Sequence, residues 1–302
     1  FETDFSDGEI PETAELFGVA EIGPDERDES DEPNEFLHVT DALNGQNGSM
    51  KIQDITDGRT FKEFEVGFRL YISDSTCCGS DDDWSPAHRP ADGWSLSIGN
   101  DLPDTISLPE EGTGSGIRIC FDTWDSGGGE APAIDVWNGV EGEVGDGAQD
   151  TWSGGLFVRQ KFDGVTAAKD EEKFRDPDTD EFVFMWTHGE WVDFSLKVYS
   201  GRIIINYKGY EMINEELPVG WPALTAPQWL FAGRTGGANS AHWVDDFYVK
   251  VFKPSGPIIS AFEGGTGGFS VSLVDAEGNG LDVDSAKAKF DGVDVAVNKT
   301  KS

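Results

Sequence analysis

Residues 121–136 read FDTWDSGGGEAPAIDV, an acidic and glycine-rich loop set between two apolar runs. The runs Ile117–Phe121 and Ile134–Trp137 are β-branched and aromatic, and they predict two strands that the loop connects. Calcium takes about six to eight oxygen ligands from carboxylates, hydroxyls and backbone carbonyls on a flexible loop. The segment therefore predicts a calcium site held by two strands. The alternative is a solvated acidic loop without an ion, which is common in acidic chains.

The 302 residues carry a large excess of acid, with 58 Asp and Glu against 22 Lys and Arg and a formal net charge of -36. Nucleic acid is excluded as a partner, because its phosphates must be neutralised by basic residues. The charge attracts divalent cations and suits an extracellular or a saline setting. Of these we expect an extracellular or cell-surface location. With 37% hydrophobic residues, including 20 Phe and 10 Trp, the chain can nevertheless fill a core.

No apolar run approaches the roughly 20 residues of a membrane-spanning helix, so we expect no membrane insertion. The chain begins at Phe1 without a basic and then apolar leader, and we expect a mature product or a trimmed fragment. Its three cysteines predict one bridge from Cys120 to Cys77 or Cys78, with a vicinal Cys77–Cys78 bridge as the rarer alternative. A zinc site is not expected, since the chain has only four His and no second Cys or His pair at ligand spacing.

Short aromatic and β-branched runs alternate with clusters of Gly, Asp, Asn and Pro along most of the chain. Apolar residues that recur at every second position are typical of strands with one buried face. The clearest such strands are Phe64–Ile72, Trp191–Tyr199, Arg202–Tyr207, Trp229–Gly233 and His242–Val251. Long helical periodicity is missing, although Lys169–Phe174 could form a turn or two. The pattern predicts an all-β fold, a β-sandwich.

A proline- and glycine-containing segment, Lys253–Pro257, predicts a boundary between residues 1–253 and 254–302. Within the first part, the acidic stretch Pro24–Pro33 predicts an exposed loop. Beyond the boundary we expect the strands Phe269–Val274, Ala286–Phe290 and Val293–Val297. An independent sandwich usually needs about 100 residues. The last part is therefore expected to be an incomplete β domain with an open sheet edge.

Three blocks of the sequence resemble, in order, the legume-type lectins and their concanavalin A-like relatives. The blocks are Ala91–Leu96, Phe121–Trp124 and Ala133–Val136, which match the family's Ala-Asp-Gly, Asp-Thr-aromatic and Ile-Asp-Val strands. The glycine-rich loop is closer to bacterial lectin-like domains, and the closing block Arg234–Asp245 fits those domains too. The resemblance implies a concanavalin A-like jelly-roll β-sandwich over residues 1–253. The hairpin Asp291–Val295 resembles the start of an Ig-like domain in large bacterial surface proteins.

The resemblance also implies a set of calcium ligands. Asp122 and the carbonyl of Trp124 match calcium ligands of the family. Ser126 stands where legume lectins carry an Asn that serves both calcium and sugar. Asp125 and Glu130 are the nearest carboxylates that can replace the missing ligands. The resemblance therefore implies Ca2+ as the cofactor of this loop.

The family's second, transition-metal site is not expected here. Its Glu is replaced by Cys120, and its His has no counterpart after Glu130. A single calcium ion, or none, remains. In the family, the Asp of the Ala-Asp-Gly block binds sugar hydroxyls, which implies the same role for Asp92. A turn residue that enters a strand is the alternative interpretation of Asp92.

Tryptophan side chains complete the predicted carbohydrate site, since aromatic faces accept the apolar surface of sugar rings. Trp124 and Trp137 flank the acidic loop and join Asp92 and Ser126 in that site. Most of the other tryptophans are expected in the core. The run Asp81–Asp83 either adds calcium ligands or is a solvated loop. We expect Arg234 and His242 to hold the last hairpin by hydrogen bonds rather than to act in catalysis.

Two functions are compatible with these features. The first is a calcium-dependent carbohydrate-binding module of an extracellular or cell-surface protein, with a glycan or polysaccharide as its partner. The second is a structural or adhesive subunit of a surface fibre or layer, assembled with copies of itself or further Ig-like domains through the C-terminal segment. An enzyme is not expected, because the chain has neither the Glu-x-Asp-x-x-Glu strand of glycosidases on this fold nor a Gly-x-Ser-x-Gly elbow.

Overall fold

The computed structural model describes residues 1–6, 8–25, 33–75, 90–104, 109–126, 129–138, 156–163, 173–217, 221, 223–252, 258–265, 268–274, 288–290 and 293–295. The chain divides into two compact units, Phe1–Val251 and Phe252–Ser302. Each unit is described by itself. Among the described residues, no helix has the length and apolarity needed to cross a membrane.

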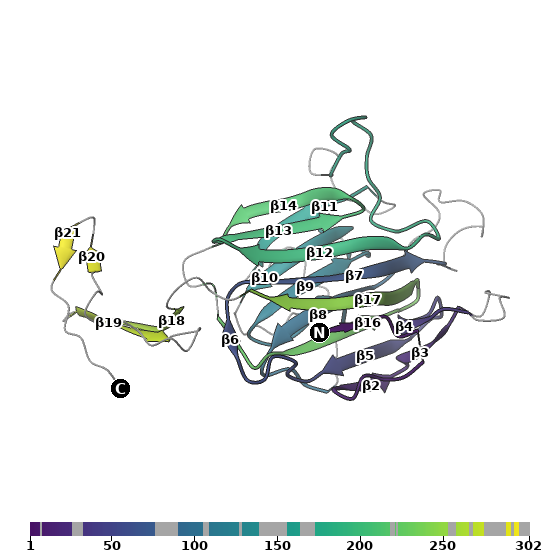
Figure 1. The fold of residues 1–302 in the computed structure, drawn as a ribbon. Coiled ribbons are helices and arrows are strands. Elements are labelled where there is room, and N and C mark those ends of the chain that lie inside the picture. Colours follow the sequence, from purple (N-terminus) through teal and green to yellow (C-terminus); the bar gives the residue numbers. More distant parts are fainter. Residues whose placement is uncertain are drawn as a thin grey trace. The chain divides into compact units, whose positions relative to one another are not determined.

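The first unit is a sandwich of two antiparallel sheets (Figure 1). In one sheet the strands run in the order β14 (Tyr210–Glu216), β13 (Arg202–Tyr207), β12 (Val192–Tyr199), β7 (Phe64–Ser73), β17 (Ala241–Val251), β4 (Glu35–Thr40) and β3 (Glu21–Pro24), with β1 (Glu2–Thr3) paired to β17. In the other the order is β11 (Leu156–Lys161), β10 (Ala133–Asn138), β9 (Ile117–Asp122), β8 (Gly93–Gly99), β16 (Gln228–Arg234), β5 (Asn47–Ile52) and β2 (Ala14–Gly18). The predicted all-β sandwich is confirmed.

Smaller elements connect these sheets. The strands β6 (Thr60–Phe61) and β15 (Leu224–Thr225) pair with each other, and η1 (Pro109–Glu111) is a single turn of 3-10 helix. The strands expected from the sequence occur where period-two alternation placed them, with ends that differ by a residue or two. Most of Lys169–Phe174 and of Pro24–Pro33 lies outside the described residues.

The core fills the space between the two sheets. Every second side chain of β7 points inward and is at most 2% exposed: Phe64, Val66, Phe68, Leu70 and Ile72. Phe68 stacks on Phe194 of β12 with ring centroids 4.8 Å apart and meets Trp94 of β8 edge-on at 5.5 Å. Burial of each such side chain contributes about 1.5–3 kcal/mol. The core therefore ties the two sheets together through aromatic rings, and Trp94 belongs to it.

The structure contradicts the disulfide bond that the sequence predicts for Cys120. It is a free, buried cysteine on β9, and its Sγ donates a hydrogen bond to the carbonyl oxygen of Glu111 in η1, at 3.0 Å. The predicted bridge from Cys120 is therefore wrong, because this side chain points to the outer face of its sheet and is covered by η1. Burial raises the pKa of the Cys120 thiol, which keeps it protonated. Cys77 and Cys78 lie outside the described residues.

The second unit contains two hairpins among its described residues. The strands β18 (Ile258–Gly265) and β19 (Gly268–Val274) form one, and β20 (Ala288–Phe290) and β21 (Val293–Val295) form the other. The expected linker 253–257 lies outside the described residues. The assignment of this unit as an incomplete Ig-like domain remains a prediction.

Strand register gathers distant segments at one end of the seven-stranded sheet. Gly93 of β8 pairs with Asp122 of β9, and Asp122 pairs with Ala133 of β10. On the other side of β8, Gly93 pairs with Arg234 of β16. The residues before β8, after β9, before β10 and after β16 therefore meet at this end. Apart from Trp137, the residues that the sequence predicts for calcium and sugar belong to the segments before β8, at or after the end of β9, and before β10.

Candidate functional site

Asp122 ends β9 and lies at the centre of the site. Its Oδ1 accepts a hydrogen bond from the backbone N–H of Trp124, at 3.1 Å. Burial raises the pKa of Asp122 well above its usual range, and the negative charges of Asp135 and Glu130 raise it further. A carboxylate in this position keeps its charge only when a cation is close to it.

The loop after Asp122 is closed by two other carboxyl groups. The Ser126 backbone N–H donates to Glu130 Oε1 at 2.7 Å, and the Gly129 N–H donates to Asp125 Oδ1 at 2.9 Å. Burial raises the pKa of Glu130, and so does a hydrogen bond between its carboxyl group and that of Asp125. Two carboxyl groups in contact need a shared proton or a cation between them.

These residues fit a hard divalent cation. The loop offers the carboxylates of Asp122, Asp125 and Glu130, together with the Ser126 hydroxyl and backbone carbonyls, and oxygen donors of this kind are what calcium selects. Ser126 is exposed, so water can reach the loop. The hydroxyl oxygen of Thr123, next to Asp122, is buried without a hydrogen-bond partner. The fold thus brings together the metal ligands that the sequence predicts.

Asp135, on the strand next to that of Asp122, is paired with the guanidinium group of Arg159. Asp135 pairs with Cys120 across β9 and β10, and both side chains lie on the outer face. Arg159 of β11 donates to both oxygens of the Asp135 carboxylate, from Nε at 2.8 Å and from Nη2 at 2.7 Å. Burial raises the pKa of Asp135, and Arg159 opposes that effect. The negative charge of Asp135 is therefore compensated by the Arg159 side chain of the protein itself.

Asp92 precedes β8 and is joined to the calcium loop through the backbone. Its N–H donates to the Arg234 carbonyl at 3.0 Å, and its own carbonyl accepts from the Thr123 N–H at 3.2 Å. The peptide bond before Asp92 is cis. The following residue, Gly93, has a φ of 142°, and a Cβ there would lie 2.4 Å from the Phe121 carbonyl oxygen. Only glycine fits at that position.

The Asp92 side chain forms an ion pair with Arg234, whose Nε lies 2.9 Å from Asp92 Oδ2. The same guanidinium reaches Glu110 Oε1 through Nη2, at 2.5 Å. Burial raises the pKa of Asp92 despite this pair. The Asp92 side chain keeps 19% of its surface exposed. Arg234 was expected to hold the last hairpin, and it instead joins two carboxylates at the edge of the site.

The structure adds Glu110 and Glu111, which sequence reasoning missed. Both belong to η1, and each has one buried carboxyl oxygen without a hydrogen-bond partner. Burial raises the pKa of Glu110 to about 7 and that of Glu111 to about 9. The sequence shows only two acids in an acidic region. Nothing in it says that Cys120 and Arg234 pack against them.

The predicted tryptophans have different surroundings. Trp124 is half-buried in the loop. Trp137 lies on the outer face of β10 opposite Arg118, whose guanidinium stacks 5.2 Å from the ring centroid, and it is only 3% exposed. Its backbone is four residues, or about 13 Å, along the strand from Ala133. Trp137 is therefore not gathered with the loop. Asp81–Asp83 lie outside the described residues.

His242 has the structural role that the sequence favoured. Its ring is buried and bonds to the hydroxyl groups of Thr40 and Ser240, at 2.7 and 2.9 Å. Burial lowers the pKa of His242 to about 3, so the ring is neutral. It cross-links β17 to β4 beneath the site.

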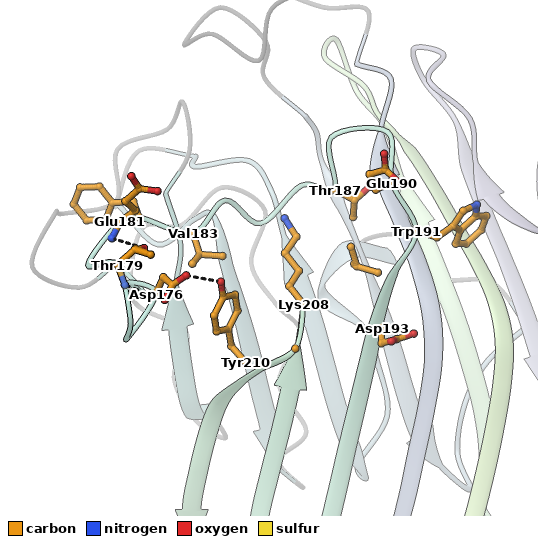
Figure 2. A pocket seen from close by; sticks show the side chains of 13 residues that line it. Asp176, Thr179, Glu181, Val183, Thr187, Glu190, Trp191, Asp193, Lys208 and Tyr210 are labelled. Atoms are coloured by element: carbon orange, nitrogen blue, oxygen red, sulfur yellow. Dashed lines mark hydrogen bonds between the residues drawn. The ribbon is translucent and has the colours of Figure 1, made fainter.

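A separate cavity of about 660 Å³ lies at the end of the other sheet, where β13 turns into β14. Figure 2 shows the Tyr210–Asp176 pair on one side of Lys208, with Thr187 and Glu190 on the other. Tyr210 donates to Asp176 at 2.8 Å, and Lys208 Nζ donates to the carbonyls of Phe184 and Trp186. Burial lowers the pKa of Lys208 to about 7. The predicted site residues do not line this cavity.

No protein-family model matches the chain, and no curated protein sequence matches it. Solved structures do match it. The exoplasmic/lumenal domain of VIP36 in its Ca2+/Man2-bound form has a TM-score of 0.55 at 12% identity, over 84% of this chain and 88% of that chain. The metal-free form of that domain has a TM-score of 0.51 at 13% identity, over 89% and 91%.

A legume lectin-like domain from Entamoeba histolytica is more distant, with a TM-score of 0.43 at 15% identity over 80% of this chain and 90% of that chain. At these identities the likeness concerns the fold. The first unit is a legume-lectin-like jelly roll, as the resemblance of the three sequence blocks implied.

Proposed function

We propose that the first unit is a calcium-dependent carbohydrate-binding module, with its site at the end of the seven-stranded sheet. The observation that carries the proposal is the register of β8, β9 and β10. Gly93 pairs with Asp122, and Asp122 pairs with Ala133. Asp92, which precedes Gly93, therefore lies beside the loop from Asp122 to Glu130 although it is distant from that loop in the sequence. The sugar would be held at Asp92 and the ion at the loop that begins with Asp122.

The electrostatics of the loop support the calcium part of the proposal. Asp122, Asp125, Glu130, the Ser126 hydroxyl and the Trp124 carbonyl would hold the ion. Bound calcium would compensate the charge of these carboxylates and fix the loop. Ser126 stays exposed, and water molecules would complete the coordination.

The sugar part of the proposal rests on Asp92. A carboxylate accepts hydrogen bonds from adjacent sugar hydroxyls, and the Arg234 pair fixes its orientation. Thr123 connects the Asp92 backbone to the calcium loop, so an ordered loop would order Asp92 as well. Trp124 offers an aromatic face and Ser126 a hydroxyl group at the same end. Trp137 is left out of the proposed site because its ring is buried.

The fold relatives supply the first ligand to try. The VIP36 domain was solved with Ca2+ and mannose oligosaccharides, and it is described as exoplasmic or lumenal. We propose a similar non-cytosolic, extracellular or cell-surface setting, which the charge of -36 also favours. Binding without catalysis is the proposed activity, because the site offers ligands for an ion and acceptors for hydroxyl groups.

Calcium binding is tested by thermal unfolding of the full chain in calcium and in EDTA. Calcium at about 100 times its Kd should stabilise the folded state by about 2.7 kcal/mol. Asp122→Asn should remove the increase in Tm. The matched control is Asp57→Asn, since Asp57 is exposed and its φ of 55° suits Asn. An identical Tm in calcium and EDTA would contradict the calcium site.

Sugar binding is tested on a glycan array that includes mannose oligosaccharides, with calcium or EDTA present. Binding should require calcium and should be lost in Asp92→Asn, while that variant keeps the calcium-dependent Tm. If calcium stabilises the chain but no glycan binds, the sugar part of the proposal fails. The structural or adhesive role would then be the better explanation of this module.

A further inference from the structure

His38 lies far along the chain from the calcium loop, in the sheet that contains β7 and β17. Neighbouring aromatic side chains hold its ring. His38 belongs to β4, and its side chain is 7% exposed. The imidazole stacks on Phe36 with centroids 4.7 Å apart and rings inclined by 7°, and it contacts Trp243 at 4.9 Å. The ring is therefore fixed in orientation by aromatic packing on the outer face.

Both ring nitrogens of His38 face acceptors. Nε2 lies 3.2 Å from the Gly23 carbonyl oxygen, and Nδ1 lies 2.8 Å from Asp41 Oδ1. A neutral imidazole has a single N–H group. When Nε2 donates to Gly23, the lone pair of Nδ1 points at a carboxylate oxygen. Two acceptors at this distance need a cation between them, either a proton or a metal ion.

The contact with Gly23 is also the support that metal-bound histidines usually have. A ligating imidazole almost always donates its second N–H to a carbonyl or carboxylate, which fixes its tautomer. The proposed ligand Asp41 is itself oriented, because Trp243 Nε1 donates to its Oδ1 at 3.0 Å.

Glu21 supplies a second carboxylate from the neighbouring strand. It pairs with His38 across β3 and β4, and ligand atoms of Glu21, His38 and Asp41 all lie within 4.8 Å of one another. Glu21 is exposed and Asp41 is 35% exposed, so an ion can enter from solvent. Ligand atoms around one tetrahedral zinc ion lie about 3.4 Å apart. The exposed Glu21 side chain has to move by roughly 1 Å to reach that spacing.

We propose that Glu21, His38 and Asp41 form a binding site for a divalent transition-metal ion of the zinc class. One imidazole nitrogen and two carboxylates suit Zn2+, and water would complete its coordination. Calcium selects oxygen ligands and is not the ion for this site. In the neutral tautomer that carries its proton on Nε2, the lone pair of Nδ1 binds the ion and no proton has to leave.

This site is distinct from the proposed calcium loop. It lies where the edge strand β3 pairs with β4 in the other sheet, and it shares no ligand with Asp122. The sequence carries no signal for this site, because positions 21, 38 and 41 do not form a His or Cys pair at ligand spacing. An ion here would link the edge strand β3 to β4 and to the turn at Asp41. It would therefore stabilise this edge of the sandwich.

Calorimetric titration of the full chain with Zn2+ tests the site. One Zn2+ should bind well above the weak background of an acidic surface, and Glu21→Gln should weaken that affinity at least about tenfold. Glu215→Gln is the matched control, since Glu215 is an exposed glutamate on β14, the opposite edge of the same sheet. Equal Zn2+ affinity in these two variants would overturn the proposal.

Two further measurements distinguish Zn2+ binding at Glu21, His38 and Asp41 from binding at other acidic residues. Co2+ should give visible absorption bands that Asp41→Asn abolishes. Asp122→Asn should bind Zn2+ as the wild type does. If that variant loses the Zn2+ signal instead, the ion occupies the calcium loop and the site at His38 is wrong.

Discussion

Asp122 and Asp135 lie on adjacent strands of one sheet, and the protein handles their charges in opposite ways. Burial raises the pKa of both carboxyl groups. Asp135 is held by two hydrogen bonds from Arg159. Asp122 accepts one backbone hydrogen bond, and in the described part of the chain no cationic side chain pairs with it. One carboxylate therefore has its own cation, and the other has none among the described residues.

This difference distinguishes a structural carboxylate from a candidate metal ligand on two adjacent strands. The Asp135–Arg159 pair is complete and offers no ligand position, so it acts as a fixed part of the sheet. The loop from Asp122 to Glu130 brings together acids whose negative charges repel one another. It is therefore the candidate position for a bound cation. At the edge of the site, Arg234 pairs with Asp92 and Glu110, yet Glu110 and Glu111 each keep one buried carboxyl oxygen without a hydrogen-bond partner.

The largest effect is expected from removing the built-in cation. Arg159→Met leaves Asp135 buried without its counter-charge, and loss of one partner of a buried pair costs about 3–5 kcal/mol. The free energy of unfolding, measured by urea denaturation, should fall by that amount. Arg59→Met is the control, since Arg59 is 72% exposed and forms only a surface pair with Asp57.

A double variant sharpens this result. With Asp135→Asn added to Arg159→Met, the buried charge is gone and much of the lost stability should return. A fall of less than about 1 kcal/mol in the single variant would mean that Asp135 is solvated or protonated, and the comparison with Asp122 would then lose its basis.

The next effect is a pH dependence caused by the two buried glutamates of η1, of which Glu110 has a counter-charge in Arg234. Glu110 and Glu111 have pKa values of about 7 and about 9 in the folded protein, against 4.5 for an ordinary glutamate. The folded state therefore binds more protons than the unfolded state in that interval. Stability is fully present below pH 4.5 and is lost as the pH rises through about 7 and about 9.

The measurement is the free energy of unfolding in EDTA at a series of pH values. Glu111→Gln copies the protonated side chain and should flatten the upper part of the curve, toward about pH 9. Glu215→Gln, on the exposed face of β14, should leave the curve as it is in the wild type. A wild-type curve that rises with pH across this interval would refute the assignment.

The sequence predicts the sandwich well because alternation is a local property. β13 alternates half-buried and buried residues, and β7 sends every second side chain into the core, so the limits of both strands follow from their apolar runs. The acidic loop is found for a related reason, since Asp122, Asp125 and Glu130 are neighbours along the chain. The strand limits, the candidate ligands of the loop and the family resemblance can all be recognised from short stretches of sequence.

What the sequence misses depends on contacts between distant segments. Arg159 is 24 residues from Asp135, and their pair follows from the register of β10 with β11. Alternation correctly places Trp137 on the face opposite Ile134, but burial of that outer face is not a local property. Cys120 was paired with a distant cysteine by count alone, whereas the turn of η1 covers it and accepts its hydrogen bond.

The smallest effect is expected at the edge of the proposed sugar site, where Gly236 lies against Asp92. A Cβ at position 236 would lie 3.1 and 3.2 Å from the two Asp92 carboxylate oxygens, so Gly236→Ala should push that carboxylate out of place. Glycan affinity should fall several-fold, while the Arg159–Asp135 pair and the calcium-dependent Tm stay as they are. Gly237→Ala is the matched control, because a Cβ there meets nothing within 4 Å. Equal glycan affinity in the two alanine variants would show that Asp92 does not contact the sugar.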